Sequence, residues 1–245
     1  MGGAWAGGLW ERKMNHIVAT SDLHGTLTGL SFIDCDIAII AGDFAKLNGG
    51  GKWPWNDQKK WIQRKFIPFI ESFPKTQFCI VPGNHDMVMD SGKTALFPDL
   101  DFKIEWPENA HVLIDEMTEI KGLKIYGTPW IPIISYRWAF ESESEKLKER
   151  FSKIPYGLDI LITHTPPHID NGCGIDRSLQ LGGYEAFGSV ELANEILEKK
   201  PRNVVCGHIH SGTHLPVHFA DSVIYNVSRV DEDYEVAYEP TILDL

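Results

Sequence analysis

HIVATSDLHG, residues 16–25, is the stretch from which the fold of the chain can be inferred. Its first half is a short apolar, β-branched run of strand length, and its second half places Asp22 and His24 directly after that run. Similar runs recur at DIAII (36–40), QFCIV (77–81), LKIYG (123–127), DILIT (159–163) and NVVCG (203–207). Runs of this kind predict central, buried strands, each followed by a loop.

Helical patterns lie between several of these runs, at 56–72, 142–151 and 189–199. The alternation of strands and helices predicts an α/β fold with layered elements. Nearer the C-terminus the pattern changes to short strand-like pieces separated by turn residues: THLPVHF (213–219), SVIYNVS (222–228) and YEVAYE (234–239). These pieces predict an antiparallel portion beside the parallel one.

The chain of 245 residues has 43% hydrophobic content, enough for one sizeable core, and we expect a single domain over 14–245. Residues 1–13, MGGAWAGGLWERK, are interpreted as a leader, a tag remnant or an upstream start before Met14, and we expect them to be disordered and to take no part in the fold. The apolar runs all fall short of the ~20 residues that span a bilayer, so no membrane partner is expected.

Cysteine content and net charge bear on the cellular compartment of the protein and on the class of its substrate or partner. The four cysteines are Cys35, Cys79, Cys173 and Cys206, and three of them lie in or beside apolar runs. Buried free thiols in a reducing compartment are the simplest interpretation, which predicts a cytoplasmic protein. The formal net charge of -11 repels polyanions, so long nucleic acid is not expected as substrate or partner.

Polar side chains of the kinds that bind metals follow five of the predicted strands. Because sites in open α/β sheets form outside the carboxyl ends of strands, these groups are expected to converge although they are far apart in sequence. The ordinary alternative is that each polar residue is a turn former, a helix cap or a hydrogen-bonded core residue. That explanation would have to hold independently at all five strand ends. The groups are Asp22 and His24, Asp43, Asn84 with His85 and Asp86, His164, and His208 with His210.

Carboxylate, amide oxygen and imidazole together suit first-row metals such as Mn, Fe and Zn. The chain has no closely spaced cysteine pair, which argues against a structural zinc site. A catalytic metal site with open positions is therefore predicted.

The order D-X-H, G-D, G-N-H-D, H and G-H-X-H, from Asp22 to His210, resembles the calcineurin-like metallophosphoesterases. Two wider segments, YGTPW (126–130) and THTPPHIDNGCGIDR (163–177), also resemble the branch that contains the vertebrate brain metallophosphoesterase-domain phosphodiesterases. The resemblance implies a sandwich of two mixed β-sheets flanked by helices, with a dinuclear metal site at the carboxyl ends of the strands.

The resemblance also implies a role for each site residue. Asp22, His24 and His210 would hold one metal ion, Asn84, His164 and His208 would hold the second, and Asp43 would bridge the two. The ions would be divalent or of mixed valence, and a hydroxide bridging them would attack phosphorus. His85 would contact the phosphate and protonate the leaving oxygen, so His85, Asp43 and Asn84 form the expected catalytic set. Asp86 is either an orienting carboxylate or a loop cap.

The preferred function is a phosphodiesterase acting on cyclic nucleotides or other small phosphodiesters. The alternatives are a phosphomonoesterase or phosphoprotein phosphatase, a nuclease acting on short oligonucleotides, and a non-catalytic binding scaffold. The expected partner is thus a small phosphoester, with nucleotides among the candidates. The segment after His210 could supply an edge strand or a dimer contact, and the oligomeric state stays open.

Several further residues have both a functional and a structural interpretation. Trp53 and Trp55 could form a wall that stacks a base, or could pack onto the core. His168 could contact substrate, and Arg177 could contact phosphate or form a surface salt bridge. His214 and His218 are expected in hydrogen-bonded or exposed positions.

Overall fold

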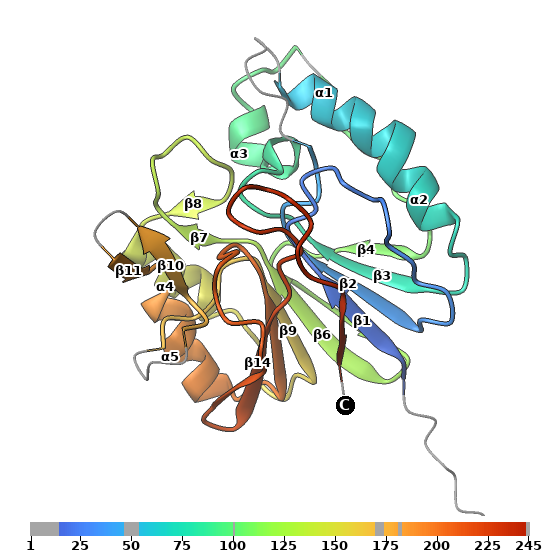
Figure 1. The fold of residues 1–245 in the computed structure, drawn as a ribbon. Coiled ribbons are helices and arrows are strands. Elements are labelled where there is room, and N and C mark those ends of the chain that lie inside the picture. The colour runs from blue at the N-terminus through green and yellow to red at the C-terminus, as the bar shows by residue number, and fades with distance from the viewer. Residues whose placement is uncertain (1–14, 47–53, 100, 170–173, 181–182, 244–245) are drawn as a thin grey trace, which may run out of the picture.

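Two β-sheets packed face to face form the centre of the protein (Figure 1). The computed structural model describes residues 15–46, 54–99, 101–169, 174–180 and 183–243, so the proposed leader at 1–13 lies outside the described residues. The first sheet has the order β15-β1-β2-β3-β4, in which all neighbours are parallel except β15 and β1. Its strands are β1 (Ile17–Thr20), β2 (Ile37–Ala41), β3 (Gln77–Val81), β4 (Ala110–Val112) and β15 (Thr241–Leu243).

The second sheet has the order β13-β14-β12-β9-β6-β5, with four parallel strands in the middle and an antiparallel strand at each edge. Its strands are β5 (Glu116–Ile120), β6 (Leu123–Thr128), β9 (Ile160–Thr163), β12 (Asn203–Cys206), β13 (Val217–Phe219) and β14 (Ser222–Asn226). Both sheets are therefore mixed. The segment after His210 supplies two edge strands, β13 and β15, one to each sheet.

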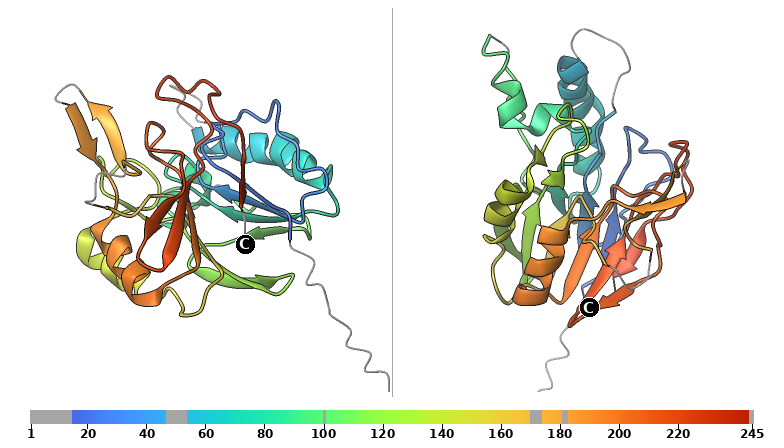
Figure 2. Two further views of the ribbon diagram at one scale, coloured as in Figure 1. Left: turned by 60° about the horizontal axis from the view of Figure 1, so that its bottom comes forward. Right: turned by 90° about the vertical axis from the view of Figure 1, so that its left-hand side faces the viewer.

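Helices cover the outer face of each sheet, which gives four layers (Figure 2). Against the first sheet lies one rod made of α1 (Pro54–Trp61), the π-helix η1 (Ile62–Phe66) and α2 (Ile67–Glu71). Against the second sheet lie α4 (Ser144–Phe151) and α5 (Val190–Lys199). Shorter elements complete the fold: η2 (Met87–Met89), α3 (Ser91–Thr94), the pair β7 (Ile131–Pro132) and β8 (Glu141–Ser142), and the hairpin β10 (Arg177–Gln180) and β11 (Gly183–Ala186).

Apolar side chains fill the spaces between the layers. Ile39 and Ala41 of β2 meet Ile162 of β9 and Val205 of β12 in the cluster between the sheets. The opposite faces of the same sheets pack against the helices, because these strands are buried on both sides. Burial on both faces explains why the strands are continuous apolar runs in the sequence. The expected sandwich of two mixed sheets flanked by helices is confirmed.

The six predicted central strands and the three predicted helices are present, with ends shifted by a few residues at most. The prediction of a strand over 234–239 is wrong. There the Val236 backbone makes one isolated bridge, to Val230, and the preceding residues form a tight turn. In that turn the Asp231 N–H donates to Glu235 O and the Tyr234 N–H to Asp231 O, so these groups are not available to a ladder.

None of the helices in the described part of the chain combines the length and apolar character needed to cross a membrane.

Candidate metal centre

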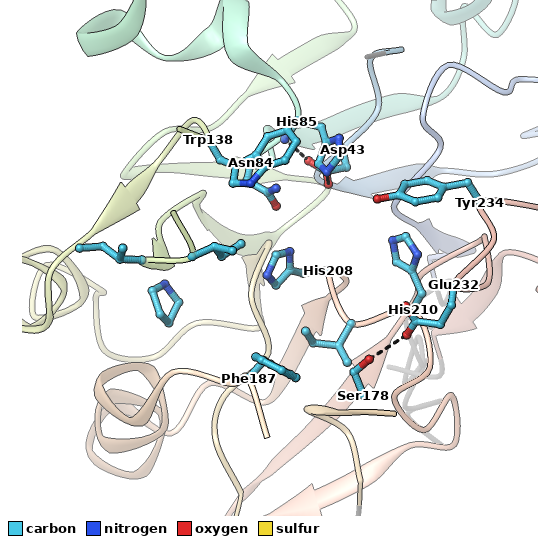
Figure 3. Close-up of a pocket in the computed structure, with 14 residues that line it drawn as sticks. Asp43, Asn84, His85, Trp138, Ser178, Phe187, His208, His210, Glu232 and Tyr234 are labelled. Carbon is cyan, nitrogen blue, oxygen red and sulfur yellow. Dashed lines mark hydrogen bonds and ion pairs between the residues drawn. The ribbon is translucent and has the colours of Figure 1, made fainter. Parts of the chain in front are cut away.

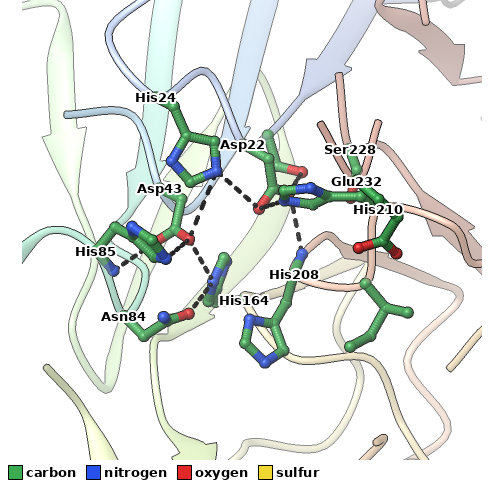
Figure 4. Close-up of polar contacts among 12 residues, drawn as sticks. Asp22, His24, Asp43, Asn84, His85, His164, His208, His210, Ser228 and Glu232 are labelled. Atoms are coloured by element: carbon green, nitrogen blue, oxygen red, sulfur yellow. Dashed lines mark hydrogen bonds and ion pairs between the residues drawn. The ribbon is translucent and has the colours of Figure 1, made fainter. Parts of the chain in front are cut away.

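The polar residues that follow the strands meet at one edge of the sandwich (Figure 4). Asp22 and His24 follow β1, Asp43 follows β2, Asn84 and His85 follow β3, His164 follows β9, and His208 and His210 follow β12. All seven expected ligands and His85 are thus brought together, three strands coming from one sheet and two from the other. In three overlapping groups of these residues, the potential ligand atoms lie within 4.8 Å of one another.

The first group consists of Asp22, His24 and His210. Asp22 Oδ1 lies 3.3 Å from His210 Nε2 and 4.0 Å from His24 Nε2. These are the three residues expected to hold one of the two ions.

The second group consists of Asp43, His164 and His208, with Asn84 beside them. His164 Nε2 lies 3.3 Å from Asp43 Oδ2 and 2.9 Å from Asn84 Oδ1. Asp43 Oδ2 is also 4.0 Å from His24 Nε2, so this carboxylate stands between the two groups. The bridging role expected for Asp43 stays a prediction, and the carboxylate lies within 4.0 Å of a histidine of each group.

Two of the histidines are oriented by backbone carbonyls. His164 Nδ1 donates to Ala41 O at 3.0 Å, and His210 Nδ1 donates to Asp231 O at 2.9 Å. A carbonyl can only accept, so the proton is fixed on Nδ1 and Nε2 is left to face the carboxylates. Metal-binding histidines in proteins are commonly held in this way.

Unsatisfied polar atoms at the centre favour a bound cation. His24 Nε2 is buried and makes no hydrogen bond in the described structure, and buried Asp22 Oδ1 has an ion-pair contact with His210 Nε2 at 3.3 Å but no hydrogen bond. Buried polar atoms usually have partners, and an ion between these atoms would supply one. The donor set and its unsatisfied atoms therefore fit the divalent metals that the ligand chemistry predicts.

The protonation of the centre follows from its burial and mutual charges. Burial alone raises the pKa of Asp43, but the positive charge of His164 offsets this and holds the pKa well below its usual value. For His164, burial is outweighed by the carboxylate of Asp43, which raises the pKa to about 9. For His210, burial is outweighed in the same way by Asp22, and the pKa is again about 9. In the metal-free protein, protons on these two imidazoles thus balance the carboxylates.

The other two histidines among the expected ligands are held neutral. Burial lowers the pKa of His24 to about 4, and burial with the charge of His164 lowers the pKa of His208 to about 3. A neutral imidazole is the form that binds a metal. These two residues are therefore ready to coordinate without losing a proton.

The backbone at the centre adopts conformations that non-glycine residues rarely occupy. Four of the expected ligand residues have positive φ angles: 53° at Asp22, 42° at His24, 52° at Asp43 and 71° at His208. Such angles are energetically unfavourable, and they cluster at functional sites where the surrounding structure enforces them.

Close packing around the ligands requires glycine at two neighbouring positions. A Cβ atom at Gly42, whose φ is 102°, would lie 2.0 Å from His164 Nδ1. At Gly83 it would lie 2.2 Å from Asp43 Oδ1. The loops after β2 and β3 can approach His164 and Asp43 this closely only because Gly42 and Gly83 have no side chains.

Asp86 holds those two loops together. Its buried carboxylate accepts hydrogen bonds from Gly83 N at 2.7 Å, Ala45 N at 2.8 Å and Phe44 N at 3.3 Å. Burial and the negative charge of Asp43 nevertheless raise the pKa of Asp86 to about 8. Both sequence interpretations hold in part, because Asp86 caps a loop and in doing so fixes the backbone of the expected ligands.

A pocket of about 450 Å³ opens onto the centre (Figure 3). Its floor carries Asp43, Asn84, His85, His208 and His210, and Ser178, Ile209 and Glu232 also line it. The remaining lining residues are apolar or aromatic: Pro132, Ile133, Ile134, Trp138, Phe187 and Tyr234. Within the described structure no lysine or arginine lines the pocket. The pocket thus has one side formed by expected metal ligands and one largely apolar side.

Sequence reasoning missed the aromatic residues of the pocket. Trp138 stacks on His85 with ring centroids 4.4 Å apart, and Tyr234 contacts His24 with centroids 4.7 Å apart. Neither residue belongs to a motif or follows a predicted strand end. Their aromatic character was the only available signal, and it does not distinguish a pocket wall from a core residue.

Glu141 was also missed, although it shapes the wall that carries Trp138. Its Oε1 accepts hydrogen bonds from the N–H groups of Ile134 and Ser135 at 2.7 and 2.6 Å, and its Oε2 accepts from Trp138 N at 2.7 Å. Oε1 also accepts from Tyr136 N at 3.1 Å. One carboxylate therefore sets the course of the loop between β7 and β8.

The remaining candidate residues do not line the pocket. His168 Nδ1 pairs with Asp176 at 2.8 Å, and His214 stacks on Tyr238. Trp55 packs against Phe97 and Phe102, as expected for a core residue. Arg177 and His218 lie on strands β10 and β13, outside the lining. The proposed wall residue Trp53 and the loop residue Cys173 are not among the described residues.

Comparison with known proteins identifies relatives over most of the chain. A family model described as calcineurin-like phosphoesterase matches residues 16–212. Metallophosphoesterase domain-containing protein 1 of Homo sapiens is 29% identical over 93% of this chain and 70% of its own length. UPF0046 protein C25E10.12 of Caenorhabditis elegans is 28% identical over 97% of this chain and 83% of its own length.

Solved structures share the fold at low sequence identity. TT1561 of Thermus thermophilus matches with a TM-score of 0.54 and 15% identity over 93% of this chain and 98% of that one. The phosphopantetheinyl hydrolase PptH of Mycobacterium tuberculosis matches with a TM-score of 0.51 and 12% identity over 90% of this chain and 91% of that one.

Proposed function

The chain belongs to the calcineurin-like phosphoesterase family, and from this premise we propose that it hydrolyses small phosphodiesters, cyclic nucleotides among them, with the help of two metal ions. The proposal joins the activity of the family to two observations made on this chain. One observation is that the potential ligand atoms form two adjoining groups, and the other is the composition of the pocket that opens onto them.

The proposed metal ligands fall into the two groups described above. Asp22, His24 and His210 would hold one ion, Asn84, His164 and His208 the other, and Asp43 both. When bound, ions such as Mn, Fe or Zn activate water and take up charge on the phosphoryl oxygens. A carboxylate shared by two ions would offset their mutual repulsion.

His85 is the proposed proton donor to the leaving oxygen. Its side chain lines the pocket, and its Nδ1 is buried without a hydrogen-bond partner in the described structure. Stacking on Trp138 fixes the plane of the ring. The backbone N–H of His85 donates to Asp43 Oδ1 at 2.7 Å, which ties the position of this residue to that of the proposed bridging carboxylate.

The composition of the pocket lining carries the preference for a diester. A phosphomonoester bears up to two negative charges near neutral pH, and pockets that select it commonly use arginine or lysine. No such residue is present in the described lining, whereas one side is formed by Ile133, Ile134, Trp138 and Phe187. A diester carries one charge and a second organic group, and this apolar side would accommodate that group.

Hydrolysis of two chromogenic esters tests the proposal. Metal-stripped protein reloaded with Mn is expected to hydrolyse bis-p-nitrophenyl phosphate with a higher kcat/KM than p-nitrophenyl phosphate. Asp43→Asn and His85→Ala should abolish most of this turnover, whereas Asp159→Asn, which alters a carboxylate paired with Arg202 away from the pocket, should not. A preference for the monoester would replace the proposal with a phosphomonoesterase. Absence of metal-dependent turnover of both esters would refute it.

A further inference from the structure

A tight turn beyond the residues matched by the family model contributes a side chain to the pocket. The match ends at residue 212, and the turn spans 231–235. Asp231 organises it: its N–H donates to Glu235 O at 2.9 Å, and its Oδ1 accepts from the N–H groups of Asp233 and Glu235, each at 3.0 Å. The same residue accepts the hydrogen bond of His210 Nδ1 through its carbonyl oxygen. The turn is thus linked directly to the proposed metal centre.

Tyr234 lies at the top of this turn and faces the centre. Its backbone φ is 63°, an angle that is unfavourable for a residue with a side chain and is held here by the hydrogen bonds of the turn. The phenol ring lies beside three histidines, with centroids 4.7 Å from His24, 5.3 Å from His210 and 6.2 Å from His85.

The hydroxyl of Tyr234 is directed into the pocket. Figure 3 shows the phenol oxygen pointing from the turn towards the side of the pocket where Asp43 lies. No described residue forms a hydrogen bond with this hydroxyl. The group is therefore free to donate to a bound molecule.

We propose that Tyr234 is a catalytic residue whose phenol donates a hydrogen bond to a non-bridging oxygen of the phosphoryl group held beside His24 and His210. The proposal rests on the proposed phosphodiester hydrolysis. Since no lysine or arginine is found in the described lining, hydrogen-bond donors such as a phenol would meet the charge on the phosphoryl oxygens that bound metals leave uncompensated. Tyr234 lies outside the ligand set and contacts the rings of His24 and His210, which places its phenol within reach of such an oxygen. It keeps its proton throughout, so no group is transferred.

Three variants distinguish the contribution of the Tyr234 hydroxyl from that of its ring. Tyr234→Phe removes the hydroxyl alone, Tyr234→Ala removes the ring as well, and Tyr238→Phe removes a hydroxyl from a tyrosine of the same segment that stacks on His214 and does not line the pocket. Each is loaded with Mn, and its metal content and thermal unfolding are measured first. Steady-state hydrolysis of bis-p-nitrophenyl phosphate and calorimetric binding of inorganic phosphate are then compared.

Tyr234→Phe is expected to lower kcat/KM by about 10- to 100-fold, the range for one hydrogen bond to a charged group, and to weaken phosphate binding. Metal content and unfolding temperature should match those of Tyr238→Phe. The proposal is overturned if Tyr234→Phe equals Tyr238→Phe in both turnover and phosphate affinity. It is also overturned if only Tyr234→Ala loses activity, because the ring would then act as a wall for the organic group.

Failure of the proposed function gives a different result from failure of this inference. If the Mn-loaded wild-type protein hydrolyses no ester, the proposed function is wrong. The contact between Tyr234 and the phosphoryl oxygen is then tested by the affinities of the variants for inorganic phosphate alone. Weaker phosphate binding by Tyr234→Phe would still support it, and equal binding would refute it.

Discussion

Asp43 illustrates how much the centre depends on single atoms. One of its oxygens accepts the His85 N–H, the other lies 3.3 Å from His164 Nε2, and Gly83 packs against it without a side chain. Adding one methyl group at Gly83 should therefore disturb the carboxylate proposed to bridge the metals.

Gly83→Ala is expected to destabilise the protein by about 1–3 kcal/mol and to weaken Mn binding, because the new Cβ would lie 2.2 Å from Asp43 Oδ1. Urea unfolding and metal titration measure the two effects. Gly157→Ala is the matched control, since nothing lies within 4 Å of a Cβ there, although its φ of 72° imposes a backbone penalty. Equal metal affinity in the two variants would contradict the prediction.

Metal binding at neutral pH should release protons. His164 and His210 have pKa values raised to about 9 in the metal-free protein, so both are protonated at pH 7, whereas coordination requires neutral imidazole. Metal affinity should therefore increase as the pH rises from about 7 towards 9. Calorimetry in buffers of different ionisation enthalpy measures the released protons, and an identical binding heat in all buffers at pH 7 would contradict the prediction.

The same two histidines should make the stability of the metal-free protein depend on pH in the opposite sense. Their folded-state pKa values lie above the ordinary value of 6.5, so their stabilising contribution is complete below about pH 6.5 and is lost as the pH rises to about 9. Urea unfolding of the stripped protein across this range measures the loss. A metal-free protein that gains stability over the same range would show that other groups dominate.

At the scale of elements, the loop between β7 and β8 depends on Glu141. Glu141→Gln replaces one carboxylate oxygen with an NH₂ group, which cannot accept a hydrogen bond, so in either orientation of the amide at least one N–H group of the loop loses its acceptor. We expect KM for bis-p-nitrophenyl phosphate to rise roughly 10-fold, with a smaller change in kcat and unchanged binding of inorganic phosphate. Glu143→Gln, at an exposed neighbouring position, is the control. Equal KM values for the two variants would exclude a role for this loop in binding the organic group.

Central strands could be predicted from sequence more completely than edge strands, although the edge strand β13 lies within the predicted piece 213–219. The interior strands β2 and β9 are buried on both faces and appear as unbroken apolar runs. The edge strand β5, with the sequence EMTEI, is largely exposed and lacks such a run. The turn at 231–235 was missed because its structure comes from the hydrogen bonds of one side chain, Asp231, and the surrounding alternation resembles a strand.

The helical rod on the first sheet shows a similar limit. Its apolar spacing predicted a helix, and the spacing does not show that the middle part is a π-helix. There the N–H of Ile67 bonds to Ile62 O, five residues earlier, directly before Pro68, which has no N–H to donate.

At the scale of the whole molecule, the order of the motifs predicted which residues would meet, since parallel strands deliver their ends to one edge. Sequence order could not show that Tyr234, Trp138 and Phe187 would complete the pocket. These residues come from loops and a hairpin whose positions depend on packing across both sheets.

Because the proposed ligands come from both sheets, metal binding should stabilise the entire fold. At a metal concentration 100 times the Kd, one site contributes about 2.7 kcal/mol, which corresponds to an increase in Tm of about 5–10 °C for a domain of this size. Differential scanning calorimetry with and without Mn measures the shift. His85→Ala should keep most of it and Asp43→Asn should lose most of it, while an unchanged Tm in the wild-type protein would contradict the prediction.

The absence of lysine and arginine from the described pocket lining also affects how an anionic substrate arrives. With a formal net charge of -11 and no lysine or arginine in that lining, long-range repulsion should slow the diffusional encounter with an anion. Added salt shortens the range of this repulsion, so kcat/KM for an anionic diester should rise, by up to about 3-fold, between low and physiological ionic strength. In an enzyme that attracts its anionic substrate with arginines, kcat/KM would instead fall as the ionic strength rises.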